Sequence, residues 1–211
     1  MRLTIVGASG GIGRQLVRLG LGDGHEVTAV VRDPAKLETP PHERLHVMRG
    51  NALDAESIAG AVDGADAVLS AMGAAGRVDP LRPASTSAAA VASAMKAAGV
   101  RRVVVVSAGP LNRDGAGQPA WIRLASKPLG AILKDAYADL ARMETILADS
   151  GLDWTSVRPS RLTDKPGKGT YRLLIEAGPA GFSIARADVA RAMLDTLGDP
   201  TTVGHAVGVS D

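Results

Sequence analysis

The chain has 211 residues, a length typical of one domain, and a formal net charge of only +2. It contains no cysteine, which excludes disulfides, thiolate chemistry and cysteine-bound zinc, and its four histidines are too scattered to predict a metal site. Dispersed basic residues and scarce aromatic residues argue against nucleic acid as a partner, and the lack of a signal peptide or a long apolar run favours a cytoplasmic protein that binds no membrane.

Strand and helix patterns alternate from the start of the chain. Arg2–Val6 is a short, β-rich apolar run that leads into a glycine turn. Leu16, Val17 and Leu19 then recur at helical spacing. Glu26–Val31 predicts a second, buried strand, so these first pieces form one β-α-β unit.

The same alternation continues along the rest of the chain. Short apolar runs predict strands at 45–48, 67–70, 102–106 and 154–157, and longer periodic segments predict helices at 55–62, 85–98, 137–149 and 187–197. Continuous apolar strands separated by helices are typical of a parallel sheet that is covered on both faces. We therefore expect an α/β fold with a doubly wound parallel sheet of the Rossmann type, in a single domain over residues 1–211.

Two segments interrupt the alternation. Residues 108–133 are long and mixed, with Trp121 among several apolar residues, and residues 161–182 are polar at first and are expected to form a short hairpin. Both segments follow the carboxyl ends of predicted strands, which is the edge where open α/β sheets bind ligands. Because long loops at that edge are more often functional than not, we expect them to form the substrate side.

The glycine turn after the first strand predicts a dinucleotide site. Gly7, Gly10 and Gly13 recur every third residue between a strand and a helix. In this motif the first glycine permits the tight turn, the second lets the backbone approach the pyrophosphate, and the third allows close packing of helix on strand. The free N–H groups and the positive dipole end of the helix would hold the phosphates. The alternative is a glycine turn that binds nothing.

The tip of the second strand indicates which dinucleotide binds. An acidic residue there would bind a ribose 2′-hydroxyl, whereas this strand ends in Arg32, whose guanidinium can fork a 2′-phosphate and stack on adenine. Lys36 can add a second charge, and we interpret Asp33 as a cap of the turn at Pro34. These residues favour NADP(H) over NAD(H), and a solvated surface arginine is the alternative.

The motifs together resemble the NAD(P)H-binding family of atypical short-chain dehydrogenases/reductases, which includes flavin reductase/biliverdin-IXβ reductase and NmrA-like proteins. The resemblance covers nearly the whole chain. It is carried by the glycine turn and by matching motifs at Val30–Leu37, Gly50-Asn51, Gly73, Val105–Ser107, Met143-Glu144, Ser150–Leu152, Arg158-Pro159 and Ile184–Ala190.

The family pattern implies where each part of the cofactor lies. It implies that the phosphates bind Ser9, Gly10, Gly11 and Ile12, the 2′-phosphate Arg32, the adenine Asn51 and Ala52, the ribose Met72, Gly73 and Ala74, and the nicotinamide Ser107 and Pro159. The reductase of this family has a histidine soon after the proline that ends the sixth strand. This sequence has Ser160 and Arg161 there, which argues against simple transfer of flavin or biliverdin specificity.

The catalytic dyad of the short-chain dehydrogenases is incomplete. Active members use Tyr-x-x-x-Lys on a helix, because the lysine ammonium lowers the tyrosine pKa for proton donation. Tyr137 lies on the corresponding helix, but Ala141 occupies the lysine position and Lys134 precedes the tyrosine by three residues. Ser107 ends a buried strand at the ligand edge and can hydrogen-bond the nicotinamide amide or a substrate oxygen. Ser107 and Tyr137 are therefore candidate catalytic residues, with turn capping and packing as alternative roles.

The remaining charged groups are expected to be solvated. Asp139, Arg142 and Glu144 fall on the same predicted helix as Tyr137 and are expected to form its solvated face. Arg161, Lys165 and Lys168 can attract an anionic substrate, but a charged loop is more often simply solvated.

Hydride transfer needs little from a protein, because the cofactor carries the chemistry and solvent can deliver protons to a flavin or quinone. The sequence therefore favours an NADPH-dependent reductase of a flavin, quinone or similar planar acceptor. Two alternatives stay open: an NmrA-like protein that senses NADP(H) without catalysis, and a carbonyl reductase or epimerase that uses Lys134 and Tyr137 in altered roles. We expect a small-molecule electron acceptor as the partner, and a monomer, with a dimer as the alternative.

Overall fold

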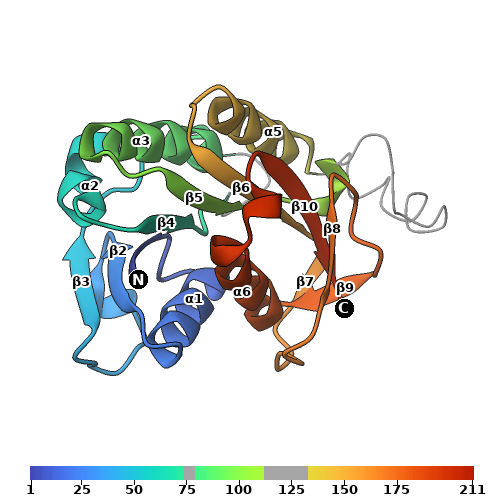
Figure 1. The fold of residues 1–211 in the computed structure, drawn as a ribbon, viewed down its shortest axis with the longest axis horizontal. Coiled ribbons are helices and arrows are strands. Elements are labelled where there is room, and N and C mark those ends of the chain that lie inside the picture. Colours follow the sequence, from blue (N-terminus) through green and yellow to red (C-terminus); the bar gives the residue numbers. More distant parts are fainter. Residues whose placement is uncertain (74–78, 112–132) are drawn as a thin grey trace.

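One mixed sheet forms the centre of the fold in the computed structural model, which describes residues 1–73, 79–111 and 133–211 (Figure 1). Its eight strands are β1 (Arg2–Val6), β2 (Glu26–Val31), β3 (Leu45–Arg49), β4 (Ala67–Ser70), β5 (Arg102–Val106), β6 (Asp153–Pro159), β8 (Arg172–Ile175) and β10 (His205–Ser210). The strand order is β3-β2-β1-β4-β5-β6-β10-β8, and every neighbouring pair is parallel except β10 with β8. This order confirms the predicted doubly wound sheet of the Rossmann type.

Helices cover both faces of the sheet. They are α1 (Gly11–Gly22), α2 (Ala55–Val62), α3 (Pro83–Ala98), α5 (Lys134–Ala148) and α6 (Arg186–Asp195), with the short 3-10 turns η1 (Pro34–Lys36), η2 (Gly109–Leu111), η3 (Thr196–Gly198) and η4 (Pro200–Thr202). In Figure 1, α1 and α6 lie on one face and α2, α3 and α5 on the other. Each helix and strand that the sequence predicted is present.

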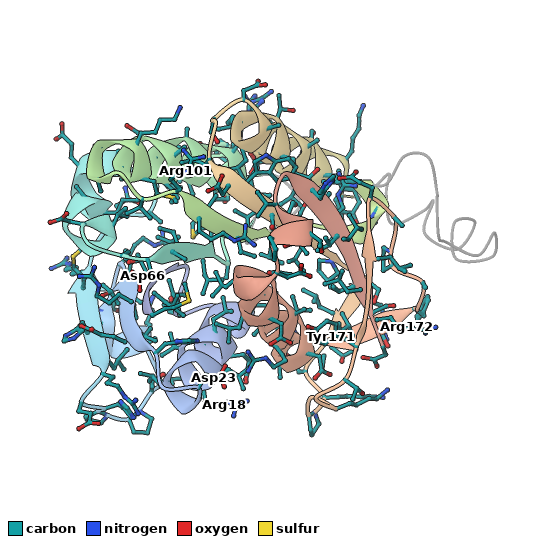
Figure 2. The ribbon with its side chains drawn as sticks, in the orientation of Figure 1. Arg18, Asp23, Asp66, Arg101, Tyr171 and Arg172 are labelled. Atoms are coloured by element: carbon teal, nitrogen blue, oxygen red, sulfur yellow. The ribbon has the colours of Figure 1, made fainter. Side chains whose placement is uncertain are left out.

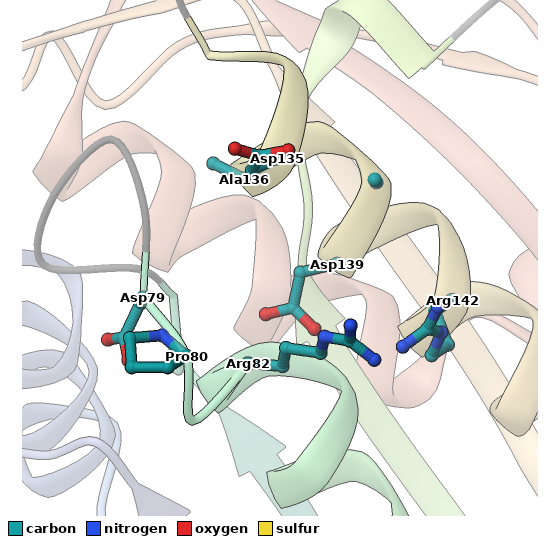
Figure 3. Close-up of a pocket in the computed structure, with 8 residues that line it drawn as sticks. Asp79, Pro80, Arg82, Asp135, Ala136, Asp139 and Arg142 are labelled. Carbon is teal, nitrogen blue, oxygen red and sulfur yellow. The ribbon is translucent and has the colours of Figure 1, made fainter.

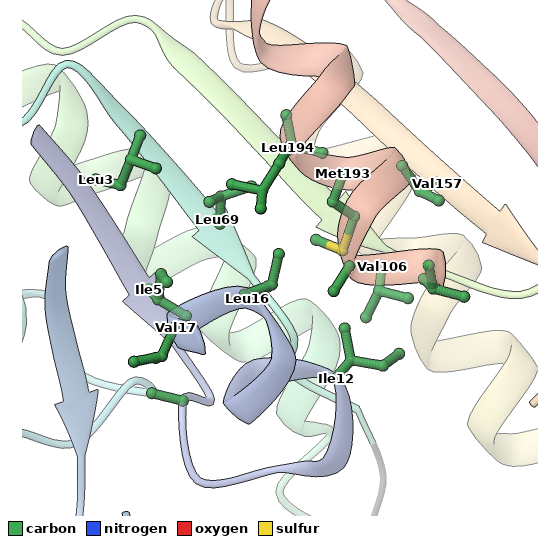
Figure 4. Close-up of a cluster of buried hydrophobic side chains, with 14 of the residues drawn as sticks. Leu3, Ile5, Ile12, Leu16, Val17, Leu69, Val106, Val157, Met193 and Leu194 are labelled. Carbon is green, nitrogen blue, oxygen red and sulfur yellow. The ribbon is translucent and has the colours of Figure 1, made fainter. Parts of the chain in front are cut away.

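Each face of the sheet has its own apolar core. Leu16 of α1 and Met193 of α6 are fully buried in one core (Figure 4), and Met95 of α3 is fully buried in the other. Successive strand residues supply the two cores in turn: Val104 belongs to the first and Val105 to the second, because neighbouring side chains of a strand point to opposite faces. Full burial of such side chains contributes about 1.5–3 kcal/mol each, which explains the near-continuous valine content of β5.

Two features near the C-terminus differ from the sequence prediction. The predicted hairpin over 161–182 is wrong: β7 (Arg161–Thr163) pairs in parallel with β9 (Ser183–Ala185), whereas β8 pairs with β10 in the main sheet. The strand β10 was not predicted, because Gly208 interrupts its apolar pattern. A Cβ on Gly208 would lie 2.4 Å from the Ala177 carbonyl oxygen, so glycine is needed where the preceding segment crosses the strand.

Some predictions fall outside the described residues. Ala74 and most of the 108–133 segment, including Trp121, belong to this group. Among the helices that the structure describes, none has both the length and the apolarity required for a membrane span. The same residues contain no cluster of three or more histidine or acidic side chains that could hold a metal ion.

Candidate functional site

A cleft of about 220 Å³ opens at the carboxyl edge of the sheet, where the strand order reverses between β1 and β4. The predicted cofactor-binding residues that line it are Gly7, Ser9, Gly10, Arg32, Asn51, Ala52, Met72 and Gly73. Ligands of open α/β sheets bind at this switch point. Sequence reasoning missed Asp79, Leu81 and Pro83, which also line the cleft. They precede or begin α3, and only the tertiary fold brings that segment to the cleft.

The glycine turn has two positions at which a side chain does not fit. Gly7 has φ +77°, and a Cβ there would lie 3.0 Å from the Ala71 carbonyl group. A Cβ on Gly13 would lie 2.1 Å from the Gly7 carbonyl oxygen, so α1 packs against the turn only with glycine at this position. These contacts agree with the roles that the sequence assigned to both residues: a tight turn at Gly7 and close helix packing at Gly13.

The first turn of α1 offers free backbone donors. Gly10 is the N-cap, no described side chain caps the helix, and the first turn contains no acidic residue. The N–H of Arg14 donates to the Gly10 carbonyl at 2.9 Å, while the N–H groups of Gly11, Ile12 and Gly13 have no acceptor among the described residues. The Ile12 side chain is buried in the core, so this residue offers only its backbone to a ligand. The turn therefore fits a pyrophosphate, which needs N–H donors and a positive dipole end.

At the end of β2, one arginine has no partner among the described residues and can bind a ligand. Arg32 is exposed, lines the cleft, and has no hydrogen bond or ion pair with any described residue. Asp33 accepts the Ala35 N–H at 3.2 Å and caps η1, as predicted, and Glu38 pairs with Arg14 at 2.7 Å. Lys36 is exposed in η1 but does not line the cleft. Arg32 is thus the group at this end of the cleft that can bind a phosphate.

Asn51, which was predicted to lie beside the adenine, lines the cleft and is held by two hydrogen bonds. Its N–H donates to Ser57 Oγ at 2.8 Å, and its side-chain oxygen accepts the Leu53 N–H at 3.2 Å. The side-chain NH₂ has no partner among the described residues. The neighbouring Ala52 is buried and supplies an apolar wall.

Ser107 and Pro159 lie at the ends of β5 and β6, outside the lining of the cleft. The Ser107 N–H donates to the Val157 carbonyl at 2.7 Å, but its hydroxyl is buried and has no partner among the described residues. The Ser160 hydroxyl, next to Pro159, is also buried without a described partner. A buried unpaired hydroxyl costs about 1–3 kcal/mol, and the predicted role of Ser107 beside the nicotinamide stays a prediction.

Tyr137 does not have the environment of a short-chain dehydrogenase tyrosine. It is half-buried in the first turn of α5, and this burial raises the pKa of its hydroxyl above the ordinary value. Lys134 is exposed at the start of the same helix, and Ala141 occupies the lysine position of the motif. No described group lowers the pKa of the tyrosine, and its catalytic role stays a prediction.

The predicted solvated face of α5 is wrong for two of its three residues. Asp139 is only 6% exposed and accepts the N–H groups of Ala84 and Ser85 at 2.9 and 3.1 Å, together with the Ser85 hydroxyl, so it caps α3. Glu144 accepts hydrogen bonds from the Arg158 guanidinium at 2.6 and 3.0 Å. Both carboxylates are buried because their partners lie on other elements, which helical spacing cannot reveal.

Comparison with known proteins supports the nucleotide site. Residues 7–200 match a family model described as NAD(P)H-binding. The chain is also similar to a relative from Bacillus subtilis (strain 168) described as the uncharacterized sugar epimerase YhfK. The two are 30% identical over 220 residues, which cover 100% of this chain and 94% of the relative.

Solved structures with similar folds confirm the architecture. One is a short-chain dehydrogenase/reductase (wide type) from Veillonella parvula in complex with NADP, with a TM-score of 0.80, 24% identity, and coverage of 100% of this chain and 94% of the other. Another is ChuY, an anaerobillin reductase from Escherichia coli O157:H7, with a TM-score of 0.79, 23% identity, and coverage of 99% and 96%.

Proposed function

The chain belongs to the NAD(P)H-binding family, and on that basis we propose that it is an NADPH-dependent reductase that transfers hydride to a flavin, quinone or similar planar acceptor. The observation that carries the proposal is the cleft that joins the glycine turn to Arg32, both of which lack a side-chain partner among the described residues. When bound, the cofactor supplies the hydride. The residues of this chain bind and orient it.

Arg32 supports the choice of NADPH over NADH. A 2′-phosphate offers oxygens that match the forked N–H donors of a guanidinium, and a charge-assisted hydrogen bond contributes about 1.5–3 kcal/mol. Asp33 is the carboxylate that could compete with the 2′-phosphate for Arg32, and it already accepts the Ala35 N–H. A fold relative of low identity that was solved with NADP agrees with this choice.

The incomplete dyad supports a flavin or quinone as the acceptor. Ser107 and Ser160 offer hydroxyls that can hydrogen-bond a ligand, but neither is a strong acid, and burial raises the pKa of Tyr137. A flavin or quinone accepts hydride with protons delivered by solvent, so positioning is sufficient. A reductase is among the proteins of similar fold, which supports this class of acceptor.

The test has two stages. Titration with NADPH and NADH, followed by nicotinamide fluorescence, should show tight NADPH binding and much weaker NADH binding. NADPH oxidation is then measured with FMN and with a soluble quinone, and we expect turnover with at least one of them. Tight NADPH binding without turnover of either acceptor would contradict the reductase and favour a nucleotide-sensing protein instead.

A carbonyl reductase or epimerase is the second candidate, because the relative that is 30% identical is described as a sugar epimerase. Ser107 at the end of β5 and Tyr137 on α5 occupy the elements that such chemistry uses. Replacing Tyr137 with Phe should abolish reduction of a sugar carbonyl in this case, because the proton donor is lost. The same variant should change flavin reduction less than about twofold, a difference that NADPH oxidation with each substrate measures directly.

A further inference from the structure

A second cavity, of about 430 Å³, lies between the start of α3 and the first turns of α5 (Figure 3). Its charged lining residues are Asp79, Arg82, Asp135, Asp139 and Arg142. Asp79 also lines the cofactor cleft, so the two hollows are neighbours. We propose that this cavity binds an anionic group of the acceptor, a phosphate or a carboxylate, through Arg82 and Arg142. The inference rests on the proposed reductase function and names the substrate class within it.

Arg82 reaches the cavity from an unusual backbone conformation. Its φ of 45° and ψ of 62° lie in the left-handed region, which residues with a Cβ rarely adopt. Its neighbours Leu81 and Pro83 line the cofactor cleft, whereas Arg82 itself lines the second cavity. Backbone strain of this kind is retained where the surrounding structure imposes it, often beside ligands. Here the turn places the Arg82 guanidinium in the cavity that faces α5.

The carboxylates of the cavity are mostly engaged elsewhere. Asp139 is bonded to the start of α3, and Asp79 accepts the Leu81 N–H at 3.1 Å. Asp79 and Asp139 keep their negative charge, but their oxygens already accept N–H groups of the chain. The lining groups that have no partner among the described residues are Asp135 and the two guanidinium groups, so these are the groups free to bond a ligand.

Neither arginine of this cavity has a counterion among the described residues. Neither side chain forms a hydrogen bond or an ion pair with any described residue, although both line the same cavity. In Figure 3 the two guanidinium groups extend toward each other beneath Asp139. Guanidinium donors that face one space bind phosphate or carboxylate oxygens with charge-assisted hydrogen bonds.

FMN and riboflavin provide the experiment, because they share the flavin ring and differ by one phosphate. For the wild-type protein with NADPH, we expect the KM for FMN to be about tenfold below that for riboflavin, with similar kcat values. Arg142→Gln and Arg82→Gln should each raise the KM for FMN toward that for riboflavin and leave riboflavin kinetics unchanged. Arg18→Gln is the matched control, because Arg18 is an exposed arginine of α1 that bonds Gln15.

Two controls keep the proposal falsifiable. Arg142 is exposed on a helix surface, so its variant tests the site even if the variant at Arg82 fails to fold. Equal KM values for FMN and riboflavin in the wild type would overturn the anion site and leave the reductase intact. If neither flavin is reduced, the quinone assay decides the proposed function, and quenching of flavin fluorescence in the presence of NADP⁺ still decides the site. Tighter FMN than riboflavin binding that Arg142→Gln removes supports it, and equal binding overturns it.

Discussion

At the scale of single residues, the cofactor preference depends on which charges at the end of β2 are already paired. Four charged groups follow one another closely there: Arg32, Asp33, Lys36 and Glu38. Both carboxylates are engaged, since Asp33 accepts the Ala35 N–H and Glu38 pairs with Arg14. Arg32 is left with no described partner. The position of Arg32 at the cleft therefore affects the cofactor preference more than the net charge of the segment does.

Replacing Arg32 with Ala should weaken NADPH binding about ten- to a hundredfold, because one or two charge-assisted hydrogen bonds to the 2′-phosphate are lost. NADH binding should change little, since NADH lacks that phosphate. Because Arg32 is exposed, the preference for NADPH should also decrease with added salt. Fluorescence titration of both nucleotides measures the effect, with Arg18→Ala as the control. An equal loss for the two nucleotides would mean that Arg32 does not contact the 2′-phosphate.

At the scale of elements, α5 is attached to the rest of the fold by two buried carboxylates. Asp139 caps α3, and Glu144 binds Arg158 of β6 and the Ser156 hydroxyl. The side chains of the Arg158–Glu144 pair are only 16% and 13% exposed. Burial lowers and Glu144 raises the pKa of the Arg158 guanidinium, with a net rise, so the guanidinium stays charged. These contacts fix α5, which carries Tyr137 and one wall of the second cavity.

Replacing Glu144 with Gln should lower the free energy of unfolding by about 3 kcal/mol, because it leaves the Arg158 charge buried and uncompensated. Urea denaturation measures this loss. The double variant Glu144→Leu with Arg158→Met should recover much of it, since an apolar pair of similar volume removes the unpaired charge. The exposed pair Arg101–Asp153 is the control, and Asp153→Asn should cost far less. Equal losses at the two sites would contradict the buried-pair explanation.

At the scale of the whole molecule, a polar network joins segments from both ends of the chain. The Tyr171 hydroxyl donates to Asp195 Oδ2 at 2.6 Å, and Arg191 of α6 pairs with Asp23 after α1 at 2.7 Å. Tyr171 and Asp23 are labelled in Figure 2. Burial, and then the hydrogen bond to Asp195, raise the pKa of Tyr171 well above its ordinary value. The network thus links the segment before β8 to α6, and α6 to α1.

The raised pKa of Tyr171 predicts a loss of stability in alkali. The folded protein keeps this hydroxyl protonated above about pH 10, where the unfolded chain ionises, so unfolding releases a proton there. The contribution is complete below about pH 10 and falls as the pH rises above it. Tyr171→Phe should therefore be less stable at neutral pH but lose less stability in alkali. Urea denaturation over a pH series tests this, and an unchanged slope in the variant would contradict it.

The sequence by itself determined the features that depend on local pattern. Strand and helix periodicity predicted the doubly wound sheet, and the glycine spacing and Arg32 predicted the phosphate-binding parts of the cleft, because each residue acts through its neighbours in the chain. The family resemblance implied the further lining residues Ser9, Asn51, Ala52, Met72 and Gly73. Only the tertiary structure decided which residues far apart in sequence come into contact. The structure shows no hairpin over 161–182 and includes the unpredicted strand β10. It also shows that Asp139 and Glu144 bind partners on other elements, and that Arg82 and Arg142 line one cavity. Such pairings depend on the packing of whole elements, which no local periodicity encodes.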